Sequence, residues 1–124
     1  MDHSPGFLQL TDDAKTRIRE ISIDQTRSWL VLNPKVVLLD VREDSEWSAG
    51  HAAEARHLGK GVLERDIEKM IPDVNTEIIM YCGGGFRSAL ACDTAQKMGY
   101  RSVHSLTGGY KAMVNAGWPM KSGG

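Results

Sequence analysis

The chain of 124 residues is long enough for one domain with a sizeable core, and its 41% apolar and 25% charged residues are ordinary for a globular protein. The net charge of −1, and the lack of any apolar run near the ~20 residues of a membrane span, argue against nucleic-acid and membrane partners. Two cysteines are too few for a disulfide scaffold, and the N-terminus lacks the basic start and apolar core of a secretory signal, so we expect a reducing, cytoplasmic setting.

The first half of the chain predicts two helices, a buried strand and a helical turn. Thr11-Asp12-Asp13 has the pattern of an N-cap with acidic first-turn residues, which predicts a short helix inside an N-terminal extension of residues 1–19. The Ser and Gln at the two ends of residues 22–25 have the spacing of a capping box, so a second helix is expected to start there. The apolar run Val36–Leu39 is typical of a strand buried on both faces, and Asp44–Trp47 predicts a helical turn.

The second half of the chain alternates helices and strands. Apolar residues at helical spacing predict a helix over residues 63–71, which Pro72 ends. Ile78–Tyr81 is a second candidate for a buried strand. A helix is expected over Ser88–Met98, with Gly99 as the residue just after its end. The remaining expectations are strands at 21–22, 56–58 and 102–106, a final short helix that opens at 108–110, and a flexible tail at 121–124.

The order of these elements predicts a fold class and the position of a site. Strands that alternate with helices indicate an α/β fold, in which a parallel sheet has helices on both faces. In such sheets, ligands bind beyond the carboxyl ends of the strands. Asp40 and Cys82 each come directly after a predicted buried strand, so both are expected at that edge.

Cys82 is the strongest candidate for a reactive residue. Three glycines, Gly83–Gly85, then Phe86 and Arg87 separate it from the helix expected at Ser88. The glycines allow several backbone N–H groups to point at one spot, and the helix N-terminus and Arg87 add positive charge there. Positive charge favours the thiolate, which is the nucleophilic form of a cysteine. The loop therefore predicts a nucleophilic sulfur in a cradle that stabilises anions.

Four segments taken together resemble the rhodanese-like sulfurtransferase family, over residues 20–119. Cys82–Ser88 resembles the catalytic loop of that family in its Cys-x-x-Gly-x-Arg form. The stretch Gly50–Ala55 departs from the family pattern, because it lacks the second glycine that often follows the Gly-His pair, and residues 10–19 lie outside the usual core. The other three segments, at 39–51, 99–110 and 117–119, resemble the first signature, the last strand with its diglycine turn, and the C-terminal end.

The resemblance implies a fold, a reaction and a set of site residues. The fold would be a three-layer α/β/α sandwich around a mainly parallel five-stranded sheet, in a domain of residues 20–120. Cys82 would take the sulfane sulfur of a donor such as thiosulfate, hold it as a persulfide, and pass it to cyanide, a thiol or an acceptor protein. No cofactor and no metal are implied. The substrate-binding residues would be Gly83, Gly84, Gly85, Phe86, Arg87 and Ser88, and the structural rim would be Asp40, Arg42, Glu46 and His51.

Two other functions stay open at the level of the sequence. A cysteine-dependent phosphatase or arsenate reductase of the same fold has five residues between its cysteine and arginine, whereas four separate Cys82 from Arg87. The shorter loop is better matched to one sulfur than to a tetrahedral phosphate. The other alternative is a non-catalytic rhodanese-like module that binds proteins, but such modules usually lack the cysteine that this chain has.

The remaining polar and thiol residues are interpreted as structural. Cys92 lies on the apolar stripe of its predicted helix, so we expect it to pack in the core. Asp40, Arg42 and Glu46 are expected to form hydrogen bonds or ion pairs that shape the rim, and His51 to stabilise a turn. Three further histidines are too scattered in the sequence to predict a metal site: His3, His57 and His104.

Overall fold

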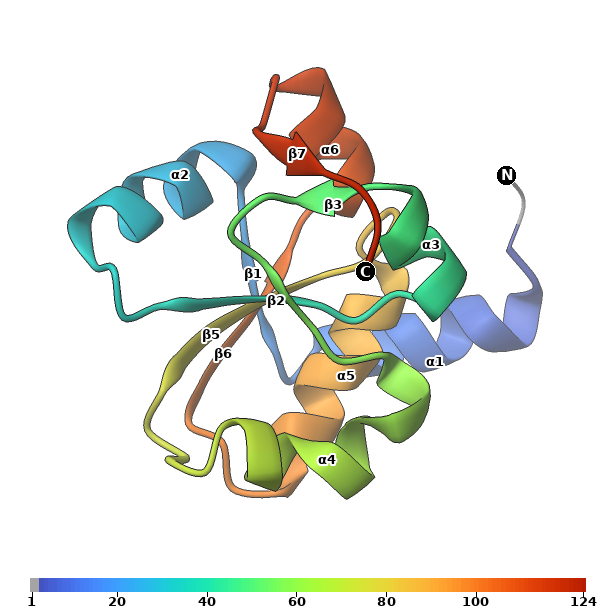
Figure 1. The fold of residues 1–124 in the computed structure, drawn as a ribbon. Helices are drawn as coiled ribbons and strands as arrows, with labels where there is room; N and C mark the ends of the chain where they lie inside the picture. The colour runs from blue at the N-terminus through green and yellow to red at the C-terminus, as the bar shows by residue number, and fades with distance from the viewer. Residues whose placement is uncertain (1–2) are drawn as a thin grey trace.

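The computed structural model describes residues 3–124, and a five-stranded parallel sheet lies at its centre (Figure 1). The strand order is β1-β6-β5-β2-β4, so β1 forms one edge of the sheet and pairs only with β6. The two apolar runs that predict buried strands are confirmed as β2 and β5. The strands are β1 (Arg19–Ile21), β2 (Val37–Asp40), β4 (Arg56–His57), β5 (Glu77–Tyr81) and β6 (Ser102–Leu106).

The side chains of β5 alternate between the two faces of the sheet. Ile78 and Met80 belong to the core cluster under α4 and α5, whereas Ile79 and Tyr81 belong to the cluster under α2 and α6. This arrangement confirms the predicted three-layer α/β/α fold (Figure 1). No helix in residues 3–124 is both long enough and apolar enough to cross a membrane. The helices are α2 (Ile23–Leu32) and α6 (Gly109–Asn115) on one face, and α4 (Leu63–Met70) and α5 (Phe86–Lys97) on the other.

Local signals place most helix ends close to where the sequence predicts them. The Ser22 hydroxyl accepts a hydrogen bond from the Gln25 N–H at 3.1 Å, and the Gln25 side chain accepts one from the Ser22 N–H at 3.0 Å. This reciprocal pair confirms the capping box at the start of α2. The predicted helical turn is confirmed as α3 (Asp44–Ala49). Helix α5 begins at Phe86, two residues before its predicted start, because the loop turns directly into the helix after Gly85.

The N-terminal helix starts earlier than the sequence analysis predicts. Helix α1 extends over Pro5–Lys15, with Ser4 as its N-cap residue and proline in its first turn. Thr11, which was expected to cap the helix, lies inside it and is fully buried. The helix therefore begins at Pro5, and it is about two turns longer on its N-terminal side than predicted.

Arg17 fastens the end of α1 to α5. Its guanidinium donates hydrogen bonds to both carboxylate oxygens of Asp93, at 2.9 and 2.8 Å, and this bonding lowers the pKa of Asp93. The Gln96 side chain adds a hydrogen bond to the Arg17 carbonyl at 3.0 Å. Helix α1 consequently packs along α5, as Figure 1 shows, and the predicted boundary after residue 19 falls inside β1.

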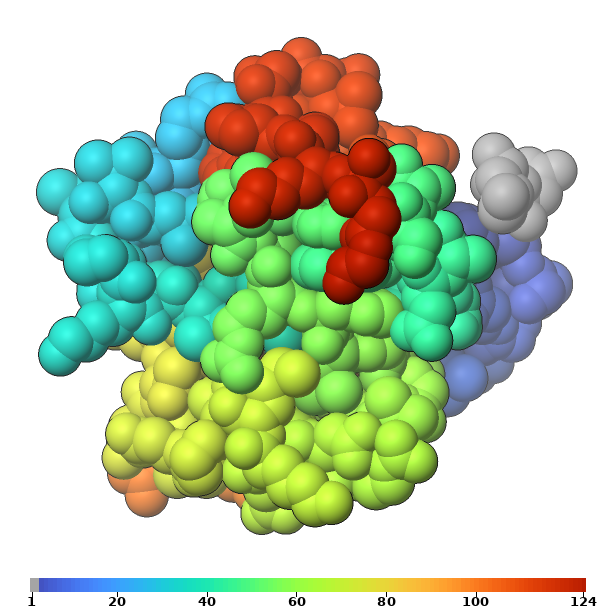
Figure 2. All heavy atoms as spheres, viewed as in Figure 1, coloured from blue at the N-terminus to red at the C-terminus, as the bar shows by residue number. Residues whose placement is uncertain are grey.

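The C-terminal residues are more ordered than the expected flexible tail at 121–124. Strand β7 (Met120–Lys121) pairs in antiparallel fashion with β3 (His51–Ala52). The Gly123 N–H then donates a hydrogen bond to the Ser48 carbonyl at 2.8 Å. Figure 2 shows this last segment, in red, lying across the green segment that contains α3 and β3. Lys121 and Gly123 therefore have backbone partners, which the sequence analysis did not predict.

Candidate active site

The Cys82 loop lies at the carboxyl edge of the sheet. Tyr81 ends β5 and is paired in register with Asp40, the last residue of β2. Cys82 follows Tyr81 directly, and α5 begins at Phe86. The loop therefore joins the end of a central strand to the N-terminus of a 12-residue helix, whose first N–H groups have no partners within the helix.

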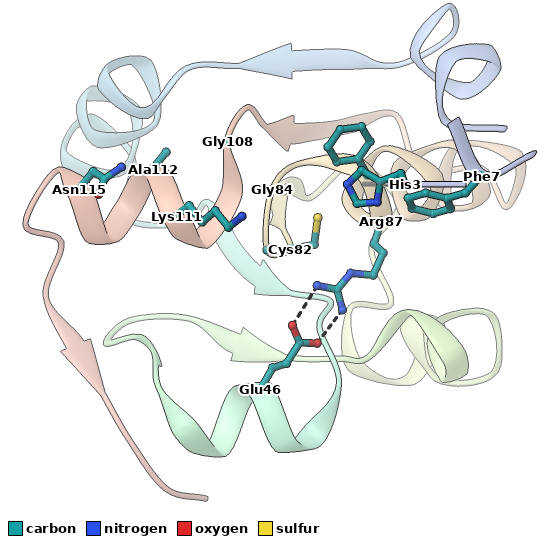
Figure 3. Close-up of a pocket in the computed structure, with 12 residues that line it drawn as sticks. His3, Phe7, Glu46, Cys82, Gly84, Arg87, Gly108, Lys111, Ala112 and Asn115 are labelled. Atoms are coloured by element: carbon teal, nitrogen blue, oxygen red, sulfur yellow. Dashed lines mark hydrogen bonds and ion pairs between the residues drawn. The ribbon is translucent and has the colours of Figure 1, made fainter. Parts of the chain in front are cut away.

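Cys82 is 1% exposed, and it lines a pocket that opens beside the loop (Figure 3). The Gly85 N–H donates a hydrogen bond to the Cys82 Sγ at 3.1 Å. The Ser88 Oγ lies 3.5 Å from the same sulfur and 2.7 Å from the Ser105 Oγ. The Gly85 N–H can stabilise negative charge on the sulfur. The Ser88 hydroxyl accepts from the Cys82 thiol, and it can donate to the sulfur once the thiol is ionised. Of the other loop residues expected to bind substrate, the pocket is lined by Gly83, Gly84, Phe86 and Arg87.

The start of α6 holds the backbone of the loop in place. The Tyr110 N–H donates to the Cys82 carbonyl at 2.7 Å, and the Lys111 N–H donates to the Gly83 carbonyl at 3.2 Å. This close approach requires glycine at position 109, because a Cβ there would lie 2.3 Å from the Cys82 carbonyl oxygen. Gly109 also has a positive φ of 53°. The diglycine turn thus belongs to the site, although the sequence analysis does not include it among the site residues.

Arg87 is held at the edge of the pocket by Glu46. The two outer guanidinium nitrogens of Arg87 lie 2.6 and 3.0 Å from the two carboxylate oxygens of Glu46, as the dashed lines in Figure 3 mark. The hydrogen bonds from Arg87 lower the pKa of Glu46 to about 2. Glu46 was expected to form hydrogen bonds or ion pairs on the rim, and the sequence analysis did not identify its partner, which is the predicted anion-binding residue Arg87. The charge that Arg87 offers to a substrate is therefore largely offset.

A second ion pair, between Asp40 and Arg42, is fully enclosed. The Arg42 Nη2 lies 2.7 Å from the Asp40 carboxylate and 2.6 Å from the Gly50 carbonyl oxygen. The guanidinium also lies over the ring of Tyr110, 4.1 Å from its centroid. Burial is the largest single influence on the Arg42 guanidinium and opposes its charge. The hydrogen bonds to Asp40 and the charges of Asp40 and other neighbouring acidic groups together outweigh burial and raise the pKa of the guanidinium. Neither residue lines the pocket. Through the contacts described above, the pair instead connects β2, the turn after α3, and α6.

His51 begins β3, directly after the turn that ends α3, and its ring packs flat against Trp47. The two ring centroids are 3.4 Å apart, and the His51 Nδ1 is 2.8 Å from the Trp47 carbonyl oxygen. His57 packs against the same indole at 4.8 Å. His51 is 5% exposed and does not line the pocket. The histidines therefore stabilise the segment that carries Glu46.

The pocket has a volume of about 810 Å³, and part of its wall comes from residues that the sequence analysis does not assign to the site. The additional residues come from the N-terminal segment and from α6. No short-range pattern indicates the N-terminal ones, because they reach the loop only through the packing of α1 on α5. The Lys111 side chain extends toward Cys82 in Figure 3. The six are His3, Phe7, Gly108, Lys111, Ala112 and Asn115.

Cys92 differs from Cys82 in its surroundings. It is fully buried in the core cluster that contains Ala91 and Ala95, and burial raises the pKa of its thiol far above the ordinary value. The expectation that Cys92 packs in the core is confirmed. Within residues 3–124, no group of three metal-ligating side chains comes together.

Comparison with known proteins places this geometry in a family. The model of the rhodanese-like domain matches residues 24–116. The thiosulfate sulfurtransferase GlpE of Coxiella burnetii is 30% identical over 90 residues, which are 72% of this chain and 82% of that protein.

Two further matches extend over α1, which lies outside the family model. The mitochondrial protein HIGH ARSENIC CONTENT 1 of Arabidopsis thaliana is 29% identical over 128 residues, covering 94% of this chain and 75% of that protein. The solved structure of RPA3614 from Rhodopseudomonas palustris, described as a possible tyrosine phosphatase, has a TM-score of 0.85 and 27% identity, with 98% of each chain covered. By its family model, its relatives and its fold, this chain belongs to the rhodanese-like family.

Proposed function

We propose that the protein is a sulfurtransferase that carries a sulfane sulfur on Cys82. The observation that supports this most directly is the position of the Cys82 Sγ, which faces the pocket with the Gly85 N–H at 3.1 Å and the Ser88 hydroxyl at 3.5 Å. A persulfide is an anion, and preorganised donors of this kind stabilise it without reorganising. The similarity to GlpE, a thiosulfate sulfurtransferase, agrees with this reading.

The reaction would take place in two steps through a covalent intermediate. The Cys82 thiolate attacks the outer sulfur of thiosulfate, a new S–S bond forms, and sulfite leaves with the electron pair of the broken S–S bond. The enzyme then holds Cys82–S–S⁻, and the charge is conserved. An acceptor such as cyanide or a thiolate attacks the terminal sulfur and regenerates the Cys82 thiolate. No proton transfer is needed when the thiol is already ionised.

The loop residues would act on the terminal sulfur and on the donor in different ways. The Gly85 N–H and Ser88 hydroxyl are positioned for the sulfur itself. The pocket in which a donor would lie is bordered by the loop at Gly83, Gly84 and Phe86. Arg87 would face the donor's oxyanion group while it remains bound to Glu46.

A phosphatase or arsenate reductase is the second candidate, because the solved structure of RPA3614, which matches 98% of this chain, is described as a possible tyrosine phosphatase. Two features of the site disfavour it. Four residues separate Cys82 from Arg87, one fewer than the phosphate-binding loop requires. The Glu46 carboxylate also occupies the face of Arg87 that would bind two phosphate oxygens.

The test is the mass of the intact protein after incubation with thiosulfate. We expect a mass increase of one sulfur atom, removed by dithiothreitol or by cyanide, with thiocyanate released in the second case. The same preparation should show negligible hydrolysis of a fluorogenic aryl phosphate and no thiol-dependent reduction of arsenate. Efficient hydrolysis or arsenate reduction, without persulfide formation, would replace the sulfurtransferase proposal with the second candidate.

Substitution of Glu46 tests whether the ion pair limits donor binding. Glu46→Gln keeps an acceptor for Arg87 but removes the negative charge, so the KM for thiosulfate should fall several-fold. The pKa of Glu46 is about 2, so its carboxylate is charged throughout an assay from pH 5 to pH 9. The effect should therefore be equal across that range. Initial rates at varied thiosulfate concentration provide the measurement, and a raised KM would show that Glu46 instead positions Arg87 for binding.

A further inference from the structure

Three aromatic rings form one wall of the Cys82 pocket. His3 precedes α1, Phe7 lies on α1, and Phe86 opens α5. The ring centroids are 4.4 Å apart for His3 and Phe86, 5.3 Å for His3 and Phe7, and 6.1 Å for Phe7 and Phe86. The rings are only partly buried by the protein itself, because their free faces border the pocket. A partly exposed aromatic cluster beside a nucleophile is suited to contact an apolar part of a substrate.

The wall has a fixed position relative to the sulfur. Arg17 pairs with Asp93 through two hydrogen bonds of 2.8 and 2.9 Å, and Gln96 bonds the Arg17 carbonyl, so the end of α1 is fastened to α5. The Lys15 ammonium also lies 4.9 Å from the centroid of the Phe86 ring. Because α5 begins at the Cys82 loop, the rings of α1 and the sulfur share one rigid support.

The charges around the pocket are poorly arranged for a small dianion. Glu46 lines the pocket and offsets Arg87. Lys111 also lines it, and no carboxylate among residues 3–124 lies within 4.0 Å of its ammonium. A lysine ammonium that has no carboxylate neighbour among the described residues, opposite an aromatic wall, suits a substrate with a single negative charge and an apolar body. In Figure 3, Lys111 lies on one side of Cys82, and His3 and Phe7 lie on the other.

We propose that the preferred donor is an organic sulfane-sulfur compound with an aromatic or similarly bulky apolar group, and that Phe7 determines this specificity. The inference rests on the proposed sulfur transfer through Cys82. For a thiosulfonate, R–SO₂–S⁻, the Cys82 thiolate attacks the terminal sulfur, and the sulfinate R–SO₂⁻ leaves with the electron pair of the broken S–S bond. The ring of R lies against Phe7 and Phe86, and the sulfonyl oxygens face Lys111.

The experiment compares two donors that differ only in the apolar group, benzenethiosulfonate and methanethiosulfonate, with cyanide as acceptor. In the wild type, the ratio of kcat/KM between the aryl and the methyl donor should exceed about tenfold, the usual size of an apolar-pocket contribution. In Phe7→Ala the ratio should fall to about threefold or less, because the substitution should lower kcat/KM for the aryl donor more than kcat/KM for the methyl donor. Dividing the wild-type ratio by the variant ratio cancels the difference in chemical reactivity between the donors.

Leu10→Ala is the matched control, because Leu10 is an exposed apolar residue of the same helix and does not line the pocket. Its ratio should equal that of the wild type. Phe7→Leu keeps the apolar area but lacks the ring, so it should give a ratio between those of the wild type and Phe7→Ala. If Phe7→Ala unfolds below the assay temperature, Phe7→Leu takes its place in the comparison. A wild-type ratio near one, or equal ratios in the wild type and the Phe7 variants, would overturn the inference and leave the sulfur transfer intact. Failure of all donors, thiosulfate included, to form a persulfide would overturn both.

Discussion

Cys82→Ser should show no persulfide and no transfer of sulfur from thiosulfate to cyanide. The serine hydroxyl is far less acidic than a thiol, and it has no sulfur with which to form an S–S bond. The covalent persulfide intermediate therefore cannot form. The fold should survive, because the new hydroxyl lies near the Ser88 Oγ and the Gly85 N–H and has hydrogen-bond partners. Intact mass after thiosulfate treatment and thiocyanate release measure the two losses, and circular dichroism verifies the fold.

The control for this variant is Cys92→Ala. Cys92 is sealed in the core, so its removal leaves a small cavity and costs about 1 kcal/mol of stability without touching the pocket. Most of the activity should remain at temperatures well below the melting transition. If Cys92→Ala were inactive and Cys82→Ser active, the assignment of the nucleophile would be wrong.

Gly109→Ala should remove both the shape of the loop and a large part of the stability. The new Cβ would lie 2.3 Å from the Cys82 carbonyl oxygen and 3.0 Å from two backbone carbons, so either the loop or α6 must move. Movement breaks the hydrogen bond from the Tyr110 N–H to that carbonyl and shifts the sulfur. The steric displacement, together with an alanine held at a left-handed φ, should lower the free energy of unfolding by about 3 kcal/mol or more. Urea denaturation and the rate of persulfide formation provide the two measurements.

Gly117→Ala separates the steric effect from the backbone effect. Gly117 also has a positive φ, of 70°, but an added Cβ there meets nothing within 4 Å. In this variant the free energy of unfolding should fall by only about 1 kcal/mol, and the activity should be kept. Equal losses of stability in the two variants would mean that the packing of α6 on the loop contributes little.

The sequence predicts those features whose causes are local. Strands β2 and β5 follow from continuous apolar runs, because a strand covered on both faces needs no polar side. The capping box of α2 follows from a spacing of three residues. The Cys82 loop is also predictable from the sequence, because Cys82, three glycines and Arg87 lie close together in the chain.

Features that depend on tertiary packing were predicted wrongly or not at all. The predicted cap of α1, Thr11, is instead a fully buried residue inside a helix that begins at Pro5, and its burial depends on packing that the sequence does not show. The ion pair of Glu46 and Arg87 joins residues 41 positions apart, a distance with no periodic signature. A strand of only two residues, such as β7, is equally hard to predict, because two positions cannot show the alternation of apolar and polar residues that is typical of a strand.

The strand order has a consequence for a chain that emerges from the ribosome N-terminus first. Strand β1 is made early, yet its only strand partner, β6, is among the last elements to be made. Strands β2, β4 and β5 can pair before then, but the Cys82 carbonyl receives its hydrogen bond only from Tyr110, which follows β6. Nascent chains of intermediate length therefore carry the thiol without its finished cradle. The complete loop geometry that the proposed sulfur transfer needs therefore exists only once synthesis is almost complete.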